Sequence, residues 1–504
     1  MLFNSYLFVF AFLPIVILVW YGLNRLGRSR LAQMALVLMS LVFYGYGHPE
    51  YIALILVSVF GNYAISWGME YFGAQKRDAK RAHLVLGIIG ITFNLGLLFY
   101  FKYYDFFVRN INRLVDTGFS VKNIALPLGI SFFTFQQISF IADRMCEKAP
   151  HYAMLDYMNF VTFFPQLVAG PIVNHKDLVP QFQRIGNDAR TLFTSAEWTD
   201  KESGRSSVEM GICLFITGLA KKVLLADKLG IVVDYGYENI ASLDALSALV
   251  VMLCYTFQIY FDFSGYCDMA VGLGWMLHIN LPRNFNSPYK ATSIKEFWNR
   301  WHITLNAFFT QYVYIPLGGS RCGTGKRLRN IMIVFMLSGI WHGAAWSFVV
   351  WGLAHGVMMC IEPIFARLAK GVRWFITFSF VNLAWVLFRS GSISVALQFY
   401  RALFSFSDTG EIWELAKQTD GSWNYLGRLL LELGGSTETA VAVYYMIVLL
   451  ALLVLAAFLC TRRNAYESVR EREISVAGMW GLAFLFAMSV ISFSGVTTFL
   501  YFNF

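Results

Sequence analysis

The stretch Ile331–Cys360 (IMIVFMLSGIWHGAAWSFVVWGLAHGVMMC) decides the fold class. It contains no lysine, arginine or carboxylate, and it exceeds the about 20 apolar residues that a helix needs to cross a bilayer. We therefore expect one membrane-spanning helix here. His342 lies thirteen residues after Arg329. At about 1.5 Å per residue, that places His342 roughly 20 Å from the start of the span, near the bilayer middle.

An ionisable side chain at such depth is costly unless it faces a protein interior or a water-filled cavity. His342 is therefore a candidate functional residue. The alternative is a histidine that is hydrogen-bonded between packed helices and has a structural role only.

The composition defines the broad class of protein. Of the 504 residues, 57% are hydrophobic and only 14% are charged, whereas soluble domains average about 25% charged residues. The mean hydropathy is +0.54. In lipid, only helices and closed barrels satisfy the backbone. Long unbroken apolar runs lack the alternation of barrel strands. The sequence thus predicts an all-α polytopic membrane protein.

The net charge of +9 is spread over short loops. This pattern is typical of the positive-inside bias of a multi-pass inner or plasma membrane protein, so we expect a lipid partner and no nucleic acid. The seven cysteines show no paired spacing, and neither zinc nor haem spacing occurs. We therefore predict no metal.

The runs divide one integral-membrane domain, 1–504, into three parts. Residues 1–120 hold N-terminal spans, 121–362 form the core with the histidines, and 363–504 hold C-terminal spans. A mostly acidic segment at about 404–440 is predicted to be an external loop, and the basic turn Gly318–Asn330 is predicted to be cytoplasmic.

Two further stretches carry polar residues in apolar surroundings. Pro127 and Gly129 predict a broken or re-entrant segment that is buried in protein. Asp262 and Asp268 predict either a polar cavity or pairing with a cation. The alternative is a pair of helix caps at a break around Gly265.

A narrow polar stripe runs along the predicted helix 295–316. Its residues recur at intervals of four, three, four and four: Lys295, Asn299, His302, Asn306 and Thr310. The rest of this helix is apolar, which favours a wall of a water-filled tunnel over an interfacial helix lying flat on the membrane. Ser338 and Trp346, one turn on either side of His342, are expected to complete the tunnel wall.

Histidine is the commonest general base. The sequence contains no Gly-x-Ser-x-Gly elbow, phosphate loop or nucleotide fingerprint. Two histidines without an obvious nucleophile suit direct acyl transfer, in which a base deprotonates an acceptor that attacks a thioester.

Seven separated blocks of the sequence together resemble the membrane-bound O-acyltransferase family, and within it the bacterial branch that O-acetylates alginate. They occur in order between residue 1 and about 362: MLFNSYLFVFAFLPI, LPLGISFFTFQQISFIAD, FFPQLVAGPI, QIYFDFSGYCDMAVGLG, FWNRWHITL, YIPLGGSR and SGIWHGAAWSFVVWGLAHG. One stretch differs: the alginate-type pattern continues Arg-Trp-His with serine-rich, charged sequence ending in Arg-Asp, whereas residues 305–311 are LNAFFTQ.

The resemblance implies a fold and a reaction. The fold would be a ring of about 11–12 transmembrane or re-entrant helices around a central tunnel. His342, between Trp341 and Gly343, would be the catalytic residue, and His302 the second. Acetyl-CoA would be the cytosolic donor. The acceptor would be an extracytoplasmic polysaccharide such as an alginate-like polymer, cellulose or peptidoglycan, modified with an extracytoplasmic acetyltransferase partner.

Two alternatives remain open. The same fold could transfer D-alanine or another acyl group to a cell-envelope polymer. Alternatively, the chain could be a non-enzymatic transporter or flippase that uses the polar stripe as its path. Transporters usually carry internal repeats, and none is evident here.

Overall fold

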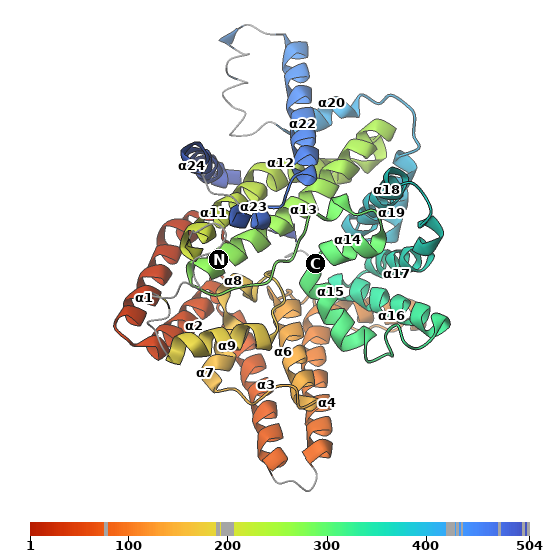
Figure 1. The fold of residues 1–504 in the computed structure, drawn as a ribbon. Helices are drawn as coiled ribbons and strands as arrows, with labels where there is room; N and C mark the ends of the chain where they lie inside the picture. The colour runs from red at the N-terminus through yellow and green to blue at the C-terminus, as the bar shows by residue number, and fades with distance from the viewer. Residues whose placement is uncertain are drawn as a thin grey trace.

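The computed structural model shows an all-helical protein and confirms the polytopic class (Figure 1). The structure describes residues 1–74, 79–187, 192, 206–419, 429, 433–434, 437–471, 475–495 and 499–500. Within these residues, seven helical segments are long and apolar enough to cross a membrane: 8–25, 50–73, 80–115, 245–276, 346–365, 370–389 and 438–461. The shorter apolar helices α2 (Ser29–Gly45) and α24 (Val476–Ile491) accompany them.

The N-terminal part begins with η1 (Phe8–Phe12) and α1 (Leu13–Arg25). Helices α3 (Glu50–Ala74) and α4 (Ala79–Leu98) then run side by side (Figure 1). The buried side chains of Asn62 and Asn94 join them by reciprocal hydrogen bonds of 3.1 and 2.6 Å. Such amide pairs hold membrane helices together. A π-helical turn, η2 (Phe99–Tyr103), follows α4 and leads into α5 (Tyr104–Val115).

The segment with Pro127 and Gly129 is broken and buried, as predicted. Gly129 has φ +72°, and a Cβ there would lie 2.6 Å from the Leu167 carbonyl oxygen, so only glycine fits. Helix α6 (Ile130–Met145) starts directly after it and is buried along nearly its whole length. Three helices follow: α7 (Met154–Thr162), α8 (Phe164–Leu167) and α9 (His175–Asn187).

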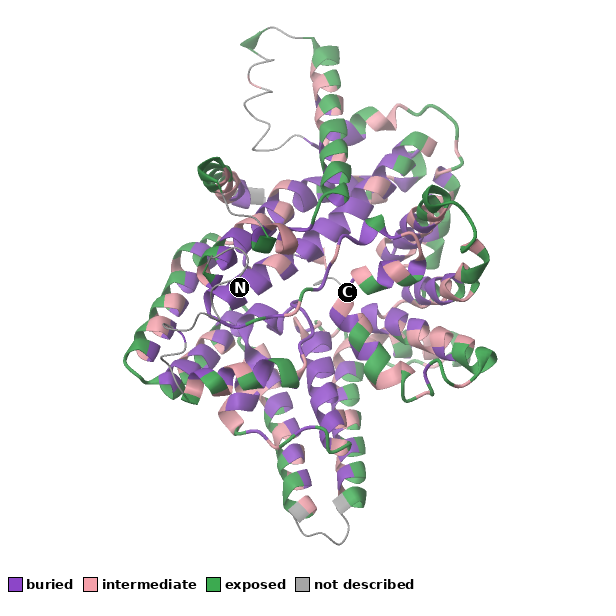
Figure 2. Cartoon of the chain, viewed as in Figure 1, coloured by how far each residue is buried: buried purple, intermediate pink, exposed green. Residues whose placement is uncertain are grey.

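Helix α13 (Ala245–Met276) forms the centre of the molecule. It is 78% buried, whereas the outer span α22 (Glu438–Thr461) is 28% buried, and Figure 2 shows the contrast. Helix α11 (Ser207–Ala220) packs closely on α13, because Gly211 and Gly218 face Gly272 and Gly265. Small residues at such a crossing let two backbones approach. The predicted helix break at Gly265 is therefore wrong, since this glycine serves close packing within a continuous helix.

The two aspartates of α13, Asp262 and Asp268, pair with cations, which is one of the alternatives predicted from the sequence. η4 (Lys221–Ala226) follows α11 and leads into α12 (Asp227–Glu238). Lys222 Nζ lies 2.5 Å from Asp262 Oδ1 and 2.8 Å from Asp227 Oδ1. Lys221 Nζ lies 2.5 Å from Asp268 Oδ2. The pairs join η4 to α13 through ionic contacts that are almost inaccessible to solvent.

The single helix predicted over Ile331–Cys360 is wrong. The stretch forms α16 (Thr324–His342) and α17 (Trp346–Ile361), joined by extended backbone at Gly343 and Ala345. The two helices fold back on each other because Gly339 and Gly352 meet: a Cβ on either would lie 2.3 Å from a carbonyl oxygen of the other helix. The apolar run is continuous, but its glycines place a reversal in the middle.

The predicted continuous helix 295–316 is also wrong. It is divided into α14 (Ile294–Arg300), α15 (Ile303–Phe309) and the π-turn η7 (Thr310–Tyr314). The interruption falls at His302, whose φ of 46° lies in the left-handed region. The Asn284 carbonyl accepts from Ile303 N there.

The C-terminal part surrounds this core with the remaining helices. They are α18 (Lys370–Arg389), α19 (Ile393–Ala402), α20 (Glu411–Lys417), α23 (Ala465–Glu471) and the 3₁₀ turn η9 (Ser492–Gly495). Three further 3₁₀ turns lie earlier in the chain: η5 (Ile240–Ser242), η6 (Pro288–Lys290) and η8 (Glu362–Phe365). The predicted external segment 404–440 contains α20, but 420–428, 430–432 and 435–436 lie outside the described residues. Its orientation and the three-part division of the chain stay predictions.

Candidate active site

His342 is the last residue of α16 and is buried among aromatic rings. Its ring centroid lies 4.9 Å from those of Trp341 and Trp351 and 5.3 Å from that of Phe388. Its Nδ1 lies 2.6 Å from the Ser338 carbonyl oxygen. Because a carbonyl can only accept, Nδ1 carries a proton, and in the neutral ring Nε2 is left with the lone pair. This is the tautomer that a general base requires.

His302 is fully buried in the connection between α14 and α15. Its Nδ1 lies 3.2 Å from Asn284 Oδ1, and Thr304 donates to the same oxygen from its backbone N and its Oγ1. Asn284 therefore fixes both the turn and the histidine ring. Phe263 meets the ring edge-on at 4.8 Å.

Trp341 lies between the two histidines. Its ring centroid is 6.0 Å from that of His302 and 4.9 Å from that of His342. Phe132 and Phe135 of α6 cover the indole at 5.6 and 5.3 Å. The structure thus brings His302 and His342 to one aromatic cluster, although the sequence places them 40 positions apart.

A cavity of about 480 Å³ approaches this cluster along α14, α15 and α16. Four residues of the predicted stripe, Lys295, Asn299, Asn306 and Thr310, line it together with Ser338. They share one wall even though the helix is interrupted between α14 and α15. Ser338 is one turn before His342, so the lining of this cavity comes within one helical turn of the candidate base.

The same cavity carries charges from the basic turn and from the neighbouring helices. Arg327 and Lys295 line it, together with Glu362, which accepts a 2.8 Å hydrogen bond from the Lys295 backbone N. Most of the other lining side chains are apolar, among them Trp298, Leu305, Ile331 and Phe335. The cavity therefore suits an elongated ligand with an anionic part and an apolar part.

A second, much smaller cavity of about 20 Å³ lies at the last turn of α16. Lys102, Ser131, Trp341 and His342 line it with residues 126–130, Phe132 and Val168. A cavity of this size has room for about one water molecule. His342 therefore lines this small cavity and does not line the large one.

Three predicted site residues lie elsewhere than expected. His302 is packed behind the large cavity and does not line it, because the chain turns at this residue. Trp346 is exposed and donates to Asn110 Oδ1 at 2.9 Å, since the reversal after His342 carries it away from the wall. Gly343 packs against the Phe348 ring, where a Cβ would come within 2.1 Å of it.

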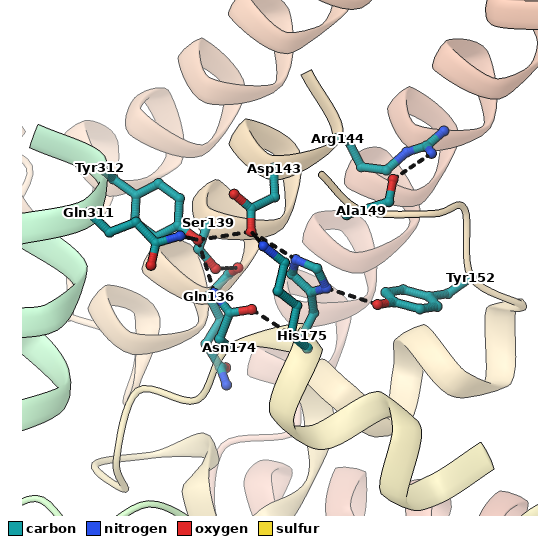
Figure 3. Close-up of polar contacts among 11 residues, drawn as sticks. Gln136, Ser139, Asp143, Arg144, Ala149, Tyr152, Asn174, His175, Gln311 and Tyr312 are labelled. Carbon is teal, nitrogen blue, oxygen red and sulfur yellow. Dashed lines mark hydrogen bonds and ion pairs between the residues drawn. The ribbon is translucent and has the colours of Figure 1, made fainter. Parts of the chain in front are cut away.

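A buried polar cluster holds η7, which contributes Tyr314 to the large cavity (Figure 3). Asp143 accepts from Tyr312 Oη at 3.2 Å and from His175 Nε2 at 3.1 Å, and Lys176 Nζ lies 2.9 Å away. Tyr152 Oη is 2.9 Å from the other ring nitrogen of His175. Burial alone would raise the pKa of Asp143, but the contacts with His175 and Lys176 outweigh it and hold that pKa below its usual value.

Lys102 is a site residue that was not predicted from the sequence. Its Nζ donates to the carbonyl oxygens of Trp341 and His342 at 2.7 and 3.1 Å and to Ser131 Oγ at 3.3 Å. The signal was present in the sequence, because Lys102 is a lone cation within an apolar stretch. Its link to His342 depends on contacts across 240 positions, which spacing cannot show.

Comparisons with known proteins point to one protein family. The profile of MBOAT, the membrane-bound O-acyltransferase family, matches residues 145–399. The chain is 36% identical to a peptidoglycan O-acetyltransferase of Helicobacter pylori, over 100% of this chain and 98% of the relative. It is 38% identical to a probable alginate O-acetylase, AlgI, of Pseudomonas aeruginosa, over 83% of this chain and 76% of that protein. A teichoic acid D-alanyltransferase of Bacillus subtilis is 29% identical over 53% of this chain and 69% of its own length.

This all-helical membrane protein, with His302 and His342 buried near a cavity of about 480 Å³, fits the class of integral-membrane acyltransferases. The chain is a member of the membrane-bound O-acyltransferase family and is an O-acyltransferase.

Proposed function

We propose that this protein transfers an acetyl group from cytosolic acetyl-CoA to an extracytoplasmic glycan of the bacterial cell envelope. The observation that carries this proposal is that two unequal cavities meet the last turns of α16. His342 lines the small cavity, and Ser338, one turn earlier, lines the large one. We place the donor in the large cavity with its acetyl group beside Ser338, and the acceptor hydroxyl at His342.

The proposed chemistry uses His342 as the general base. Its Nε2 takes the proton of the acceptor hydroxyl while the hydroxyl oxygen attacks the thioester carbonyl carbon. The carbon–sulfur bond then breaks, and the imidazolium returns its proton to the departing thiolate. The products are an O-acetyl ester and free CoA. Trp341 separates His302 from this step, so His302 acts as a positioning residue that keeps the indole and α16 in place.

The proposed donor fits the charges and shape of the large cavity. Lys295 and Arg327 would meet the phosphates of CoA, and a helix N-terminus with Lys326 and Arg329 adds to the positive potential. The stripe residues Asn299, Asn306 and Thr310 would hydrogen-bond the amides of the pantetheine arm. Ser338 would lie beside the acetyl group.

The proposed acceptor is peptidoglycan. The relative named for peptidoglycan matches this chain along its whole length, whereas the alginate relatives match 81–83% of it. The departure of residues 305–311 from the alginate-type pattern points the same way. We further propose that the protein resides in the bacterial inner membrane and works with an extracytoplasmic acetyltransferase that completes the transfer to the polymer.

Deletion of the gene tests the function and the acceptor together. We expect base-labile acetate to disappear from peptidoglycan and to remain on exopolysaccharide, with recovery on complementation. Loss from exopolysaccharide alone would replace peptidoglycan by an alginate-type acceptor. Unchanged acetate on both polymers would contradict O-acetyl transfer. Labelled acetyl-CoA supplied to inside-out vesicles should label the glycan, whereas right-side-out vesicles should not.

Filling the large cavity should block the donor without unfolding the protein. Asn306→Trp adds bulk directly to the cavity wall, so we expect acetate transfer to fall by at least about tenfold through a higher KM for acetyl-CoA. Ala307 is the neighbouring residue on α15 and is exposed. Ala307→Trp is therefore the matched control and should retain wild-type transfer. Equal activity of the two variants at equal membrane levels would remove the cavity from the donor path.

A further inference from the structure

Lys102 is a charged residue in an otherwise apolar stretch. It lies within the helical segment Lys80–Val115, which is long and apolar enough to span a membrane. Charged side chains inside membrane segments are costly, and they usually face the interior and serve a function. Lys102 sits on the π-helical turn η2, a distortion that is found frequently at functional sites. The turn aims the side chain of Lys102 at the end of α16.

Lys102 and Tyr103 together donate hydrogen bonds to the carbonyl oxygens of the last turn of α16. Lys102 Nζ contacts the carbonyl oxygens of Trp341 and His342, and Tyr103 Oη donates to the Ile340 carbonyl oxygen at 2.8 Å. The last four carbonyls of a helix have no partner within the helix. Two consecutive residues of η2 therefore bind three consecutive carbonyls, and His342 is the last residue of that turn.

Burial favours the neutral amine of Lys102, whereas its hydrogen-bond contacts favour the charged ammonium form. An ammonium group has three N–H donors, and Nζ has three oxygen acceptors, namely Ser131 Oγ and the carbonyls of Trp341 and His342. A cation at a helix C-terminus also interacts favourably with the helix dipole. The charge is thus held beside the imidazole of His342.

We propose that Lys102 is a positioning residue for acyl transfer. It fixes the turn that carries His342, and its positive charge keeps the imidazole neutral, the form that can accept a proton. The other ionisable groups around His342 are His302, from the α14–α15 connection, and His355 of α17. Neither carries a negative charge that would offset Lys102. This inference rests on the proposed role of His342.

Variants of Lys102 test the proposal through the pH dependence of transfer. In Lys102→Met we expect kcat to fall by about 10²-fold, because the base is misplaced, while KM for acetyl-CoA stays unchanged, since Lys102 does not line the large cavity. The acidic limb of the pH–rate profile should move to higher pH, because an imidazole without a neighbouring cation binds a proton more readily. Lys102→Arg should restore the wild-type profile. Lys122, an exposed lysine nearby, provides the control: Lys122→Met should match the wild type.

Wild-type kcat in Lys102→Met at equal membrane levels would overturn the proposal. An acidic limb of the pH–rate profile that stays at its wild-type position in Lys102→Met would also overturn the proposal, because a purely structural role lowers the rate without moving that limb. If Lys102→Met does not accumulate in the membrane, Lys102→Gln decides by the same shift, since it is neutral but still donates hydrogen bonds. Activity in His342→Ala would contradict the proposed base itself, so failure of the function and failure of this inference give different results.

Discussion

Replacing His342 by alanine should lower acetate transfer by about 10²–10⁴-fold, the contribution of a general base. His342 is buried at the end of α16, and its Nδ1 hydrogen bond to Ser338 leaves Nε2 as the proton acceptor. Transfer from labelled acetyl-CoA in inside-out vesicles measures the effect, normalised to the amount of protein in the membrane.

His342→Gln separates the loss of the base from the loss of packing, since glutamine fills much of the same space but does not accept a proton at neutral pH. It should be as inactive as His342→Ala. His48 is an exposed histidine paired with Glu50, and His48→Ala should be fully active. Wild-type transfer in both His342 variants would exclude general-base catalysis here and favour the transporter alternative.

Replacing Lys222 by methionine should destabilise the protein by about 3–5 kcal/mol, the cost of breaking a buried ion pair from one side. Lys222 is 1% exposed, and its carboxylate partners Asp227 and Asp262 are 6% and 3% exposed. Without the ammonium group, two carboxylates remain close together in an apolar interior. The expected result is a lower unfolding temperature in detergent and less protein in the membrane.

A surface pair provides the control for Lys222. Lys417 contacts Glu414 at 2.7 Å with both side chains about half exposed, and such pairs contribute at most about 1 kcal/mol. Lys417→Met should therefore leave the unfolding temperature nearly unchanged. Adding Asp227→Asn and Asp262→Asn to Lys222→Met should recover part of the lost stability. Equal stability of the two single variants would show that the buried network is not required.

The sequence was sufficient to predict the class of protein, the burial of His342 and most of one cavity wall. Hydropathy alone defines membrane helices, and the interval pattern of Asn299, Asn306 and Thr310 reports a shared face. This shared face persists across the interruption at His302, since residues of both α14 and α15 line the same cavity. Pairing of Asp268 with a cation followed from the cost of burying a charge.

The errors at Ile331–Cys360 and at Trp346 have one physical origin, which is that hydropathy does not record where a helix reverses. The run Ile331–Cys360 is apolar throughout, yet Gly339 and Gly352 hold two halves together as a hairpin. Trp346 was therefore assigned to a wall from which the reversal removes it. The contact of Lys102 with His342 and the fixing of His302 by Asn284 are tertiary contacts, and no local pattern encodes them.

The buried ion pairs of η4 also constrain how the chain enters the membrane during synthesis. Lys221 and Lys222 emerge from the ribosome before Asp262 and Asp268, which they neutralise in the folded protein. A lysine at the centre of an inserting helix costs about 2.5–3.5 kcal/mol on the translocon scale. Lys222 meets one carboxylate partner, Asp227, soon after it in the chain, whereas Asp268, the partner of Lys221, follows 47 positions later. Neutralising Lys221 in this way therefore links the membrane insertion of η4 to that of α13.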